Sequence, residues 1–192
     1  MQLALFLSHN NFLGSLKAFA NLPRGIAAVD LGFNKFTGGI PQSLTTLPQL
    51  NYLDLGANAL TGPIPAFCHA KQQLFYLNLA SNDLSGPPTP LSSPSCSASL
   101  AYLFLSSNRL SGPIPATISS FTRLKRLLLD KNTLAGSIPA GERAAKGARG
   151  ARGRENVKQR RPGQSETGRV GMLRGVRGGR GRIEGIEERI GD

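Results

Sequence analysis

The chain has 192 residues and a formal net charge of +12, from 23 Lys and Arg against 11 Asp and Glu. No run of 18 apolar residues occurs, so the sequence predicts no membrane-spanning helix. Two cysteines are too few for a disulfide-rich scaffold or a cysteine zinc site. Residues 1–140 carry nine Lys and Arg against four Asp and Glu, whereas 141–192 carry fourteen against seven. The composition therefore divides the chain into two parts.

The first part repeats one pattern from its beginning. The opening stretch MQLALFLSHNNF lacks a basic n-region and a small-residue cleavage site, so it is not predicted to be a signal peptide. It fits instead the first of six copies, which recur every 24 to 26 residues and align on Asn10, Asn34, Asn58, Asn82, Asn108 and Asn132. Apolar residues stand five and three positions before each Asn and two after it, and Gly always stands four after it.

These offsets predict the local structure of each copy. Apolar residues two apart share one face of a strand, so short strands are expected at 5–7, 29–31, 53–55, 77–79, 103–105 and 127–129. Such a face is buried only when copies stack, which predicts a solenoid with a parallel sheet on its concave side. The Asn side chains, which both donate and accept, are expected to satisfy the bend after each strand as a stacked ladder. The Gly permits positive φ, and the Pro residues disfavour long helices on the return path.

The pattern L-x-x-L-x-L-x-x-N-x-L, over residues 2–140, resembles the leucine-rich repeat. The trailing G-x-I-P at 38–41, 62–65, 112–115 and 136–139 resembles its plant-specific subclass, which includes leucine-rich-repeat extensins, polygalacturonase inhibitors and receptor ectodomains. The resemblance implies an α/β repeat solenoid: a right-handed coil with a short-stranded parallel concave sheet and a mostly 3-10 or extended convex side. It further implies a secreted or cell-wall protein that binds a peptide, a glycan or a cell-wall protein without catalysis or cofactor.

The residues between the strand leucines are expected to face outward from the concave sheet. There the three tyrosines of the chain fall at one offset in consecutive copies, with polar and aromatic residues beside them. Tyr suits binding surfaces because it offers a large area and a hydroxyl, although cross-strand aromatics also stabilise sheets. Small residues two before the Asn were expected to leave room for a ligand. The predicted ligand-binding residues are Tyr52, Asp54, Phe75, Tyr76, Asn78, Tyr102, Phe104 and Arg126.

No catalytic or metal-binding constellation is evident. Cys68 and His69 are neighbours in sequence and are expected to point apart, and an open sheet gives Asp30 and Asp54 no apolar pocket for acid catalysis. Cys68 and Cys96 fall on the return segments of adjacent copies. They are candidates for a disulfide, with two buried small apolar residues as the alternative.

The last copies lead into a different sequence. The 26-residue interval contains GPPTPLSSPSCSAS, an insertion expected to bulge outward. Residues 141–192 are rich in Gly and Arg and lack aromatics, which predicts a disordered basic tail. That tail is either an arm that binds RNA or another polyanion, an incidental extension, or a misjoined gene segment. A third reading of the whole chain is a truncated product without independent function, whose open ends at Leu5, Leu7, Leu134 and Ile138 favour aggregation.

Overall fold

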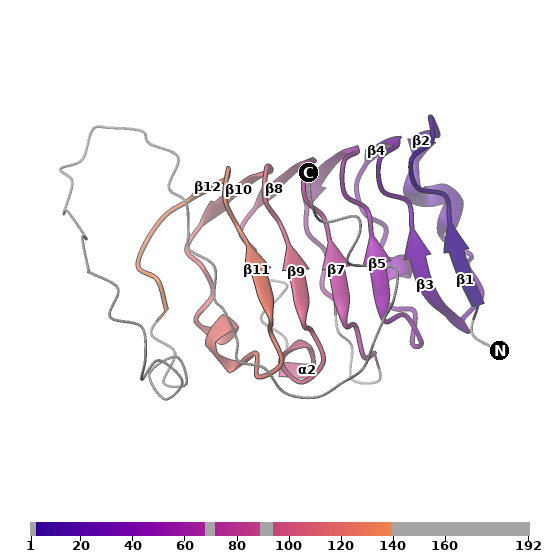
Figure 1. Ribbon diagram of the computed structural model, residues 1–192. Coiled ribbons are helices and arrows are strands. Elements are labelled where there is room, and N and C mark those ends of the chain that lie inside the picture. The colour runs from indigo at the N-terminus through magenta and orange to yellow at the C-terminus, as the bar shows by residue number, and fades with distance from the viewer. Residues whose placement is uncertain (1–2, 68–71, 89–93, 140–192) are drawn as a thin grey trace.

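The computed structural model describes residues 3–67, 72–88 and 94–139, which form six stacked coils numbered here in chain order (Figure 1). Each coil contributes one strand to each of two parallel sheets. The first sheet contains, in order, β1 (Leu3–Phe6), β3 (Ile26–Asp30), β5 (Tyr52–Asp54), β7 (Tyr76–Asn78), β9 (Tyr102–Phe104) and β11 (Arg126–Leu128). It is the sheet predicted from the period-two leucines, and the repeat solenoid predicted from the sequence is confirmed. The predicted tail lies outside the described residues.

A second sheet was not predicted. It contains, in order, β12 (Thr133–Leu134), β10 (Arg109–Gly112), β8 (Asp83–Gly86), β6 (Ala59–Pro63), β4 (Lys35–Gly38) and β2 (Leu13–Ser15). These strands follow directly after each Asn, and each pairs in parallel with the same segment of the neighbouring coil. Stacking the coils brings these short extended segments into hydrogen-bonding range, so regular pairing forms where unpaired extended chain was expected.

The remainder of each return path is short and largely irregular, as predicted. The helices of the described residues are η1 (Leu16–Phe19), α1 (Gln42–Thr45), α2 (Pro94–Ser97) and η3 (Ala116–Ser120). None of them is long and apolar enough to cross a membrane. Only part of the insertion between coils 4 and 5 is described, so the predicted bulge at 89–93 lies outside the described residues.

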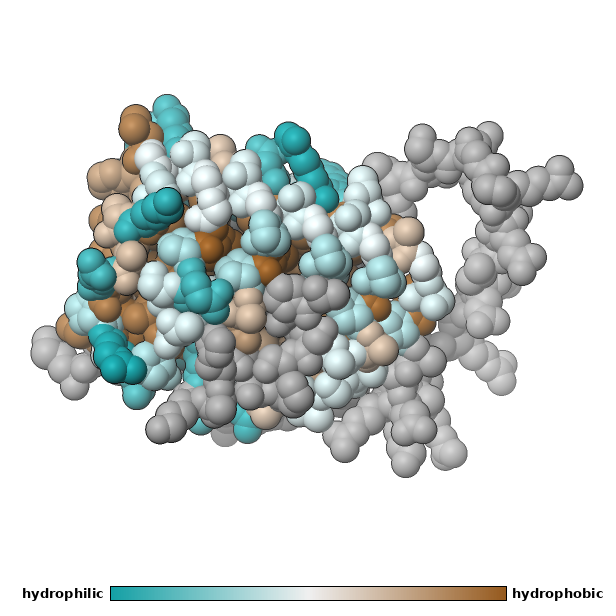
Figure 2. Space-filling model, turned by 180° about the vertical axis from the view of Figure 1, so that it is seen from behind, coloured by the Kyte–Doolittle hydropathy of each residue, from teal (hydrophilic) through white to brown (hydrophobic). Residues whose placement is uncertain are grey.

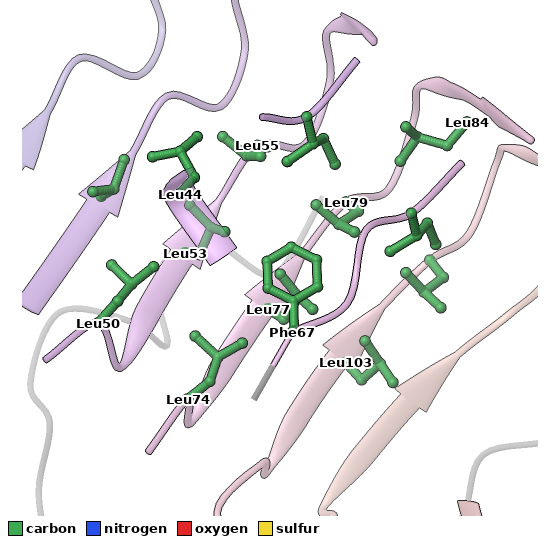
Figure 3. Packing of buried hydrophobic residues seen from close by; sticks show 14 of the residues in the cluster. Leu44, Leu50, Leu53, Leu55, Phe67, Leu74, Leu77, Leu79, Leu84 and Leu103 are labelled. Atoms are coloured by element: carbon green, nitrogen blue, oxygen red, sulfur yellow. The ribbon is translucent and has the colours of Figure 1, made fainter. Parts of the chain in front are cut away.

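A single apolar core runs between the two sheets. The leucines at the repeated offsets are fully buried in the internal coils, as Leu53, Leu55 and Leu60 illustrate. Phe67 also belongs to this core, although it stands at no repeated offset, and Figure 3 shows its ring within the cluster of labelled leucines. Each coil buries its inward face only against its neighbours, so stability grows with stacking.

The asparagines connect adjacent coils. In coil 4, the Asn82 side-chain oxygen accepts from the backbone amide of Leu60 at 3.0 Å. Its Nδ2 donates to the carbonyl of Leu55 in the preceding coil at 3.0 Å, and to those of Leu79 and Ala80 in its own coil at 3.2 Å each. The same arrangement recurs at the other asparagines from Asn34 to Asn132. Each Asn therefore satisfies buried backbone groups on both sides of the bend.

The bend also depends on two left-handed positions. The Gly residues four after each Asn have φ between 76° and 101°, consistent with the role predicted for them. The residue before each Asn is also left-handed, with φ between 51° and 56°, yet it is never Gly: the six are His9, Phe33, Ala57, Ser81, Ser107 and Lys131. Residue type gave no signal for this second position, which is imposed by the turn.

Candidate binding surface on the first sheet

The candidate surface is built by the in-register pairing of the first sheet. Tyr52 pairs with Tyr76, and Tyr76 with Tyr102, so the three tyrosines form one column across β5, β7 and β9. In the next outward column, Asp54 of β5 pairs with Asn78 of β7. Parallel strands in register bring equivalent positions together, which explains how residues 24 to 26 apart in sequence meet here.

The aromatic rings of this column pack on one another. Tyr52 and Tyr76 stack with centroids 4.4 Å apart and planes 9° from parallel. Tyr76 contacts Phe104 edge-to-face at 5.6 Å, and Phe75 contacts Tyr102 in the same way at 5.5 Å. Such contacts fix ring orientation and add stability beyond area burial. The column is therefore an ordered aromatic layer.

The predicted binding residues divide into buried and accessible ones. Tyr76 is only 7% exposed and Asp54 9%, and Phe104 is also buried, so these three support the surface rather than present it. The sequence showed that they point outward from the strand but not that their neighbours cover them. Tyr52, Phe75, Asn78, Tyr102 and Arg126 are partly exposed and form the accessible part.

A buried polar cluster lies beneath the tyrosines. The Tyr76 hydroxyl donates to Asp54 Oδ2 at 3.2 Å, and Asn78 Nδ2 donates to both carboxylate oxygens of Asp54 at 3.1 and 3.0 Å. The Gly56 amide donates to Asp54 Oδ1 at 2.9 Å. Burial is the largest effect on Asp54 and raises its pKa, and these hydrogen bonds oppose the shift only in part. Burial and the nearby Asp54 carboxylate raise the pKa of Tyr76, so its hydroxyl stays protonated as the donor.

The small residues two before the Asn do not leave the expected space for a ligand. A Cβ at Gly56 would lie 2.7 Å from Asn78 Nδ2, and a Cβ at Gly32 would lie 3.0 Å from Asp54 Oδ1. The side chains of the neighbouring coil already occupy these places. Gly32 and Gly56 therefore accommodate the polar cluster, which corrects the interpretation of these positions as ligand room.

Charge differs between the two ends of the surface. Asp30 and Asp54 lie on β3 and β5, whereas Arg126 lies on β11 with Lys125 directly before it. The Lys125 ammonium is 5.9 Å from the centroid of the Tyr102 ring, within cation–π range. The accessible tyrosines thus lie between an acidic and a basic end.

The other predicted site residues lie elsewhere. Cys96 is buried in α2 and is disulfide-bonded. Cys68 and His69 lie outside the described residues, so the pairing of Cys68 with Cys96 stays a prediction. Within the described residues, no group of three or more His, Cys, Asp or Glu side chains is arranged to hold a metal ion.

Replacing Asp54 by Asn is expected to change how stability depends on pH. The folded-state pKa of Asp54 lies above its ordinary value of 3.8, so the folded protein binds more protons than the unfolded chain between these values. The contribution of the protonated carboxyl is complete below 3.8 and is lost as pH rises through the folded-state pKa. Wild type should therefore lose stability relative to Asp54→Asn between about pH 4 and 7, as measured by urea unfolding. A pH-independent difference would contradict this assignment.

Comparison with known proteins agrees with the geometry. A family model described as Leucine Rich Repeat matches residues 99–121. The ectodomain of the Arabidopsis receptor kinase HAESA, solved with the peptide hormone IDA and the co-receptor SERK1, is 41% identical with a TM-score of 0.64 over 70% of this chain. The ectodomain of the receptor kinase SOBIR1 from Arabidopsis thaliana is 28% identical with a TM-score of 0.60 over 71% of this chain and 72% of its own. No curated protein sequence matches.

The chain is a plant-type leucine-rich-repeat protein. It spans 22% of the HAESA chain, about a fifth of that ectodomain. A plant ice-binding protein is also similar, with 28% identity, a TM-score of 0.61 and coverage of 72% of this chain and 43% of its own. Such different neighbours mean that the fold alone does not define a ligand.

Proposed function

We propose that the chain is a non-catalytic extracellular binding module whose first sheet binds an extended peptide segment across its strands. The observation that carries this proposal is the stacked aromatic layer. Tyr52 and Tyr102 are partly exposed, and the buried Tyr76 holds them in place from between, at centroid distances of 4.4 and 6.2 Å. Rings ordered before binding lose little side-chain entropy when a ligand covers them.

The surroundings of the layer favour a peptide over a purely apolar ligand. Asn78 contributes amide hydrogen-bonding groups beside the tyrosines, and the acidic and basic ends lie on either side. A peptide has both charged side chains and backbone groups to match them. The HAESA ectodomain was solved with a peptide hormone, which supports the same ligand class here.

Double substitution Tyr52→Ala/Tyr102→Ala should weaken peptide binding about tenfold or more, since truncating a Tyr anchor commonly costs more than about 1 kcal/mol. Peptides would be selected from a random phage-displayed library and their affinities measured by calorimetry. Phe33→Ala is the matched control, because this exposed ring lies in the turn after β3 and outside the aromatic layer.

Both proteins should keep the wild-type melting temperature within a few degrees, which separates lost binding from lost folding. Equal affinity of wild type and the double variant, or failure of the library to yield any binder, would refute the proposal. Selective binding of cell-wall oligosaccharides in the same assay would assign the surface to a glycan instead.

A further inference from the structure

The two ends of the described solenoid expose apolar positions that are buried elsewhere. Phe12, whose equivalents Phe36 and Leu60 are buried, is 45% exposed in coil 1. Ile138 in coil 6 is 74% exposed, whereas its equivalent Ile64 is buried. Figure 2 shows apolar surface gathered at the end formed by the first coils, at the left of that view. Each end is thus half of an interface that the molecule forms internally between every two coils.

Backbone hydrogen bonds between coils all run in one direction. Three amides of each coil donate to carbonyls of the following coil, as in coil 1, where Leu7 donates to Asp30 at 2.8 Å and His9 to Gly32 at 3.0 Å. In coil 5, Leu105 donates to Leu128 at 2.9 Å and Ser107 to Asp130 at 3.0 Å. Within the described chain, coil 1 therefore presents carbonyls without a preceding donor, at Phe6, Ser8 and His9. Coil 6 presents amides without a following acceptor, at Leu129, Lys131 and Asn132.

The Asn ladder adds a second complementary pair. The Asn34 side-chain oxygen accepts from the Phe12 amide in the preceding coil at 3.0 Å, and Leu110 donates to Asn132 in the same way at 3.0 Å. Asn10, in coil 1, has no preceding coil among the described residues to supply such an amide. The equivalent amide at the other end belongs to Leu134, which no described Asn follows.

We infer that coil 6 of one copy of this chain stacks on coil 1 of another, head to tail, as a seventh coil would. This arrangement sets donors against acceptors at every position, and it covers Phe12 of one copy with Leu134 and Ile138 of the next. Pairing two coil-1 ends would oppose carbonyls to carbonyls, and pairing two coil-6 ends would oppose amides to amides. The contact uses two different surfaces, so it leaves one of each free and builds an open series.

Charge sets the conditions for this association. Coil 6 carries Arg126 and Lys131, and coil 1 carries Lys17 with no acidic residue before Asp30. Like charges repel across the contact, and salt screens that repulsion, since the Debye length falls from about 10 Å at 0.1 M to about 3 Å at 1 M. Association should therefore strengthen as salt is raised.

Two single substitutions test the polarity of the contact. Phe12→Lys blocks the coil-1 end, and Leu134→Lys blocks the coil-6 end. Sedimentation velocity of the full chain in high salt should show wild type growing beyond the dimer with concentration. Each variant alone should stay monomeric, because its one intact end has no partner. An equimolar mixture should form a dimer and nothing larger, since one free end of each kind remains.

A control and a replacement variant keep the test decisive. Phe33→Lys removes an exposed ring away from both ends, at a position where Lys131 already occupies the same left-handed conformation, so it should assemble like wild type. Circular dichroism checks folding, and Ile138→Lys replaces Leu134→Lys if the latter melts early. Monomeric wild type at all concentrations, growth of Phe12→Lys like wild type, or a mixture without dimer would overturn the inference.

Discussion

Asn82→Ala is expected to lower the unfolding free energy by about 3 kcal/mol, because each buried backbone group left without a partner costs about 1–3 kcal/mol. The substitution removes the acceptor of the Leu60 amide and the donor to the Leu55 carbonyl. Both lost partners are in the preceding coil, and Ala cannot replace either. Urea unfolding followed by circular dichroism measures the change.

Asn10→Ala is the matched control. Asn10 is exposed and bonds only within its own coil, to the carbonyls of Leu7 and Ser8. Water can replace these bonds, so the control should cost less than about 1 kcal/mol. If the two substitutions cost the same, the asparagines contribute only to their own turns, and the connection between coils lies elsewhere.

Phe67→Ala is expected to cost about 3–5 kcal/mol, the range measured for deleting large aromatic side chains from packed cores. Phe67 is fully buried among the leucines of the first sheet and α1, shown around it in Figure 3. The equivalent positions of coils 2 and 5 hold Ser43 and Thr117, so no second aromatic ring stands at this level to fill the cavity.

Thermal and urea unfolding of Phe67→Leu provide the comparison. Leu keeps most of the apolar volume and should recover the larger part of the loss. A cost below about 1 kcal/mol for Phe67→Ala would mean that the surrounding leucines collapse into the space, contrary to the close packing of this core.

The repeat pattern contained most of the fold. Period-two leucines located the first sheet, and their fixed spacing put Tyr52, Tyr76 and Tyr102 in one column, as the register shows. The second sheet was missed because its strands, such as Thr61-Gly62-Pro63 in β6, contain residues that disfavour strands in isolation. Their pairing arises only once the coils have stacked.

The site was predicted less completely than the fold. Sequence offsets show which way a side chain points, but not that Asn78 and Tyr76 cover Asp54. Phe67 was missed for a related reason, since it belongs to one coil alone and no periodic signal contains it. Features that depend on a contact between particular neighbours are the ones that a repeat pattern cannot express.

The left-handed residue before each Asn has a consequence for how the molecule assembles. A residue with a side chain loses roughly 1–2 kcal/mol in this conformation. In coil 2 the amides of Phe33 and Asn34 offset that cost by donating to Gly56 and Ala57 of the next coil, at 2.9 and 3.2 Å. An isolated coil has no such acceptors, so its turn is unfavourable until a neighbour is in place. Folding is therefore cooperative through its turns as well as through its core, and order propagates from an existing pair of coils.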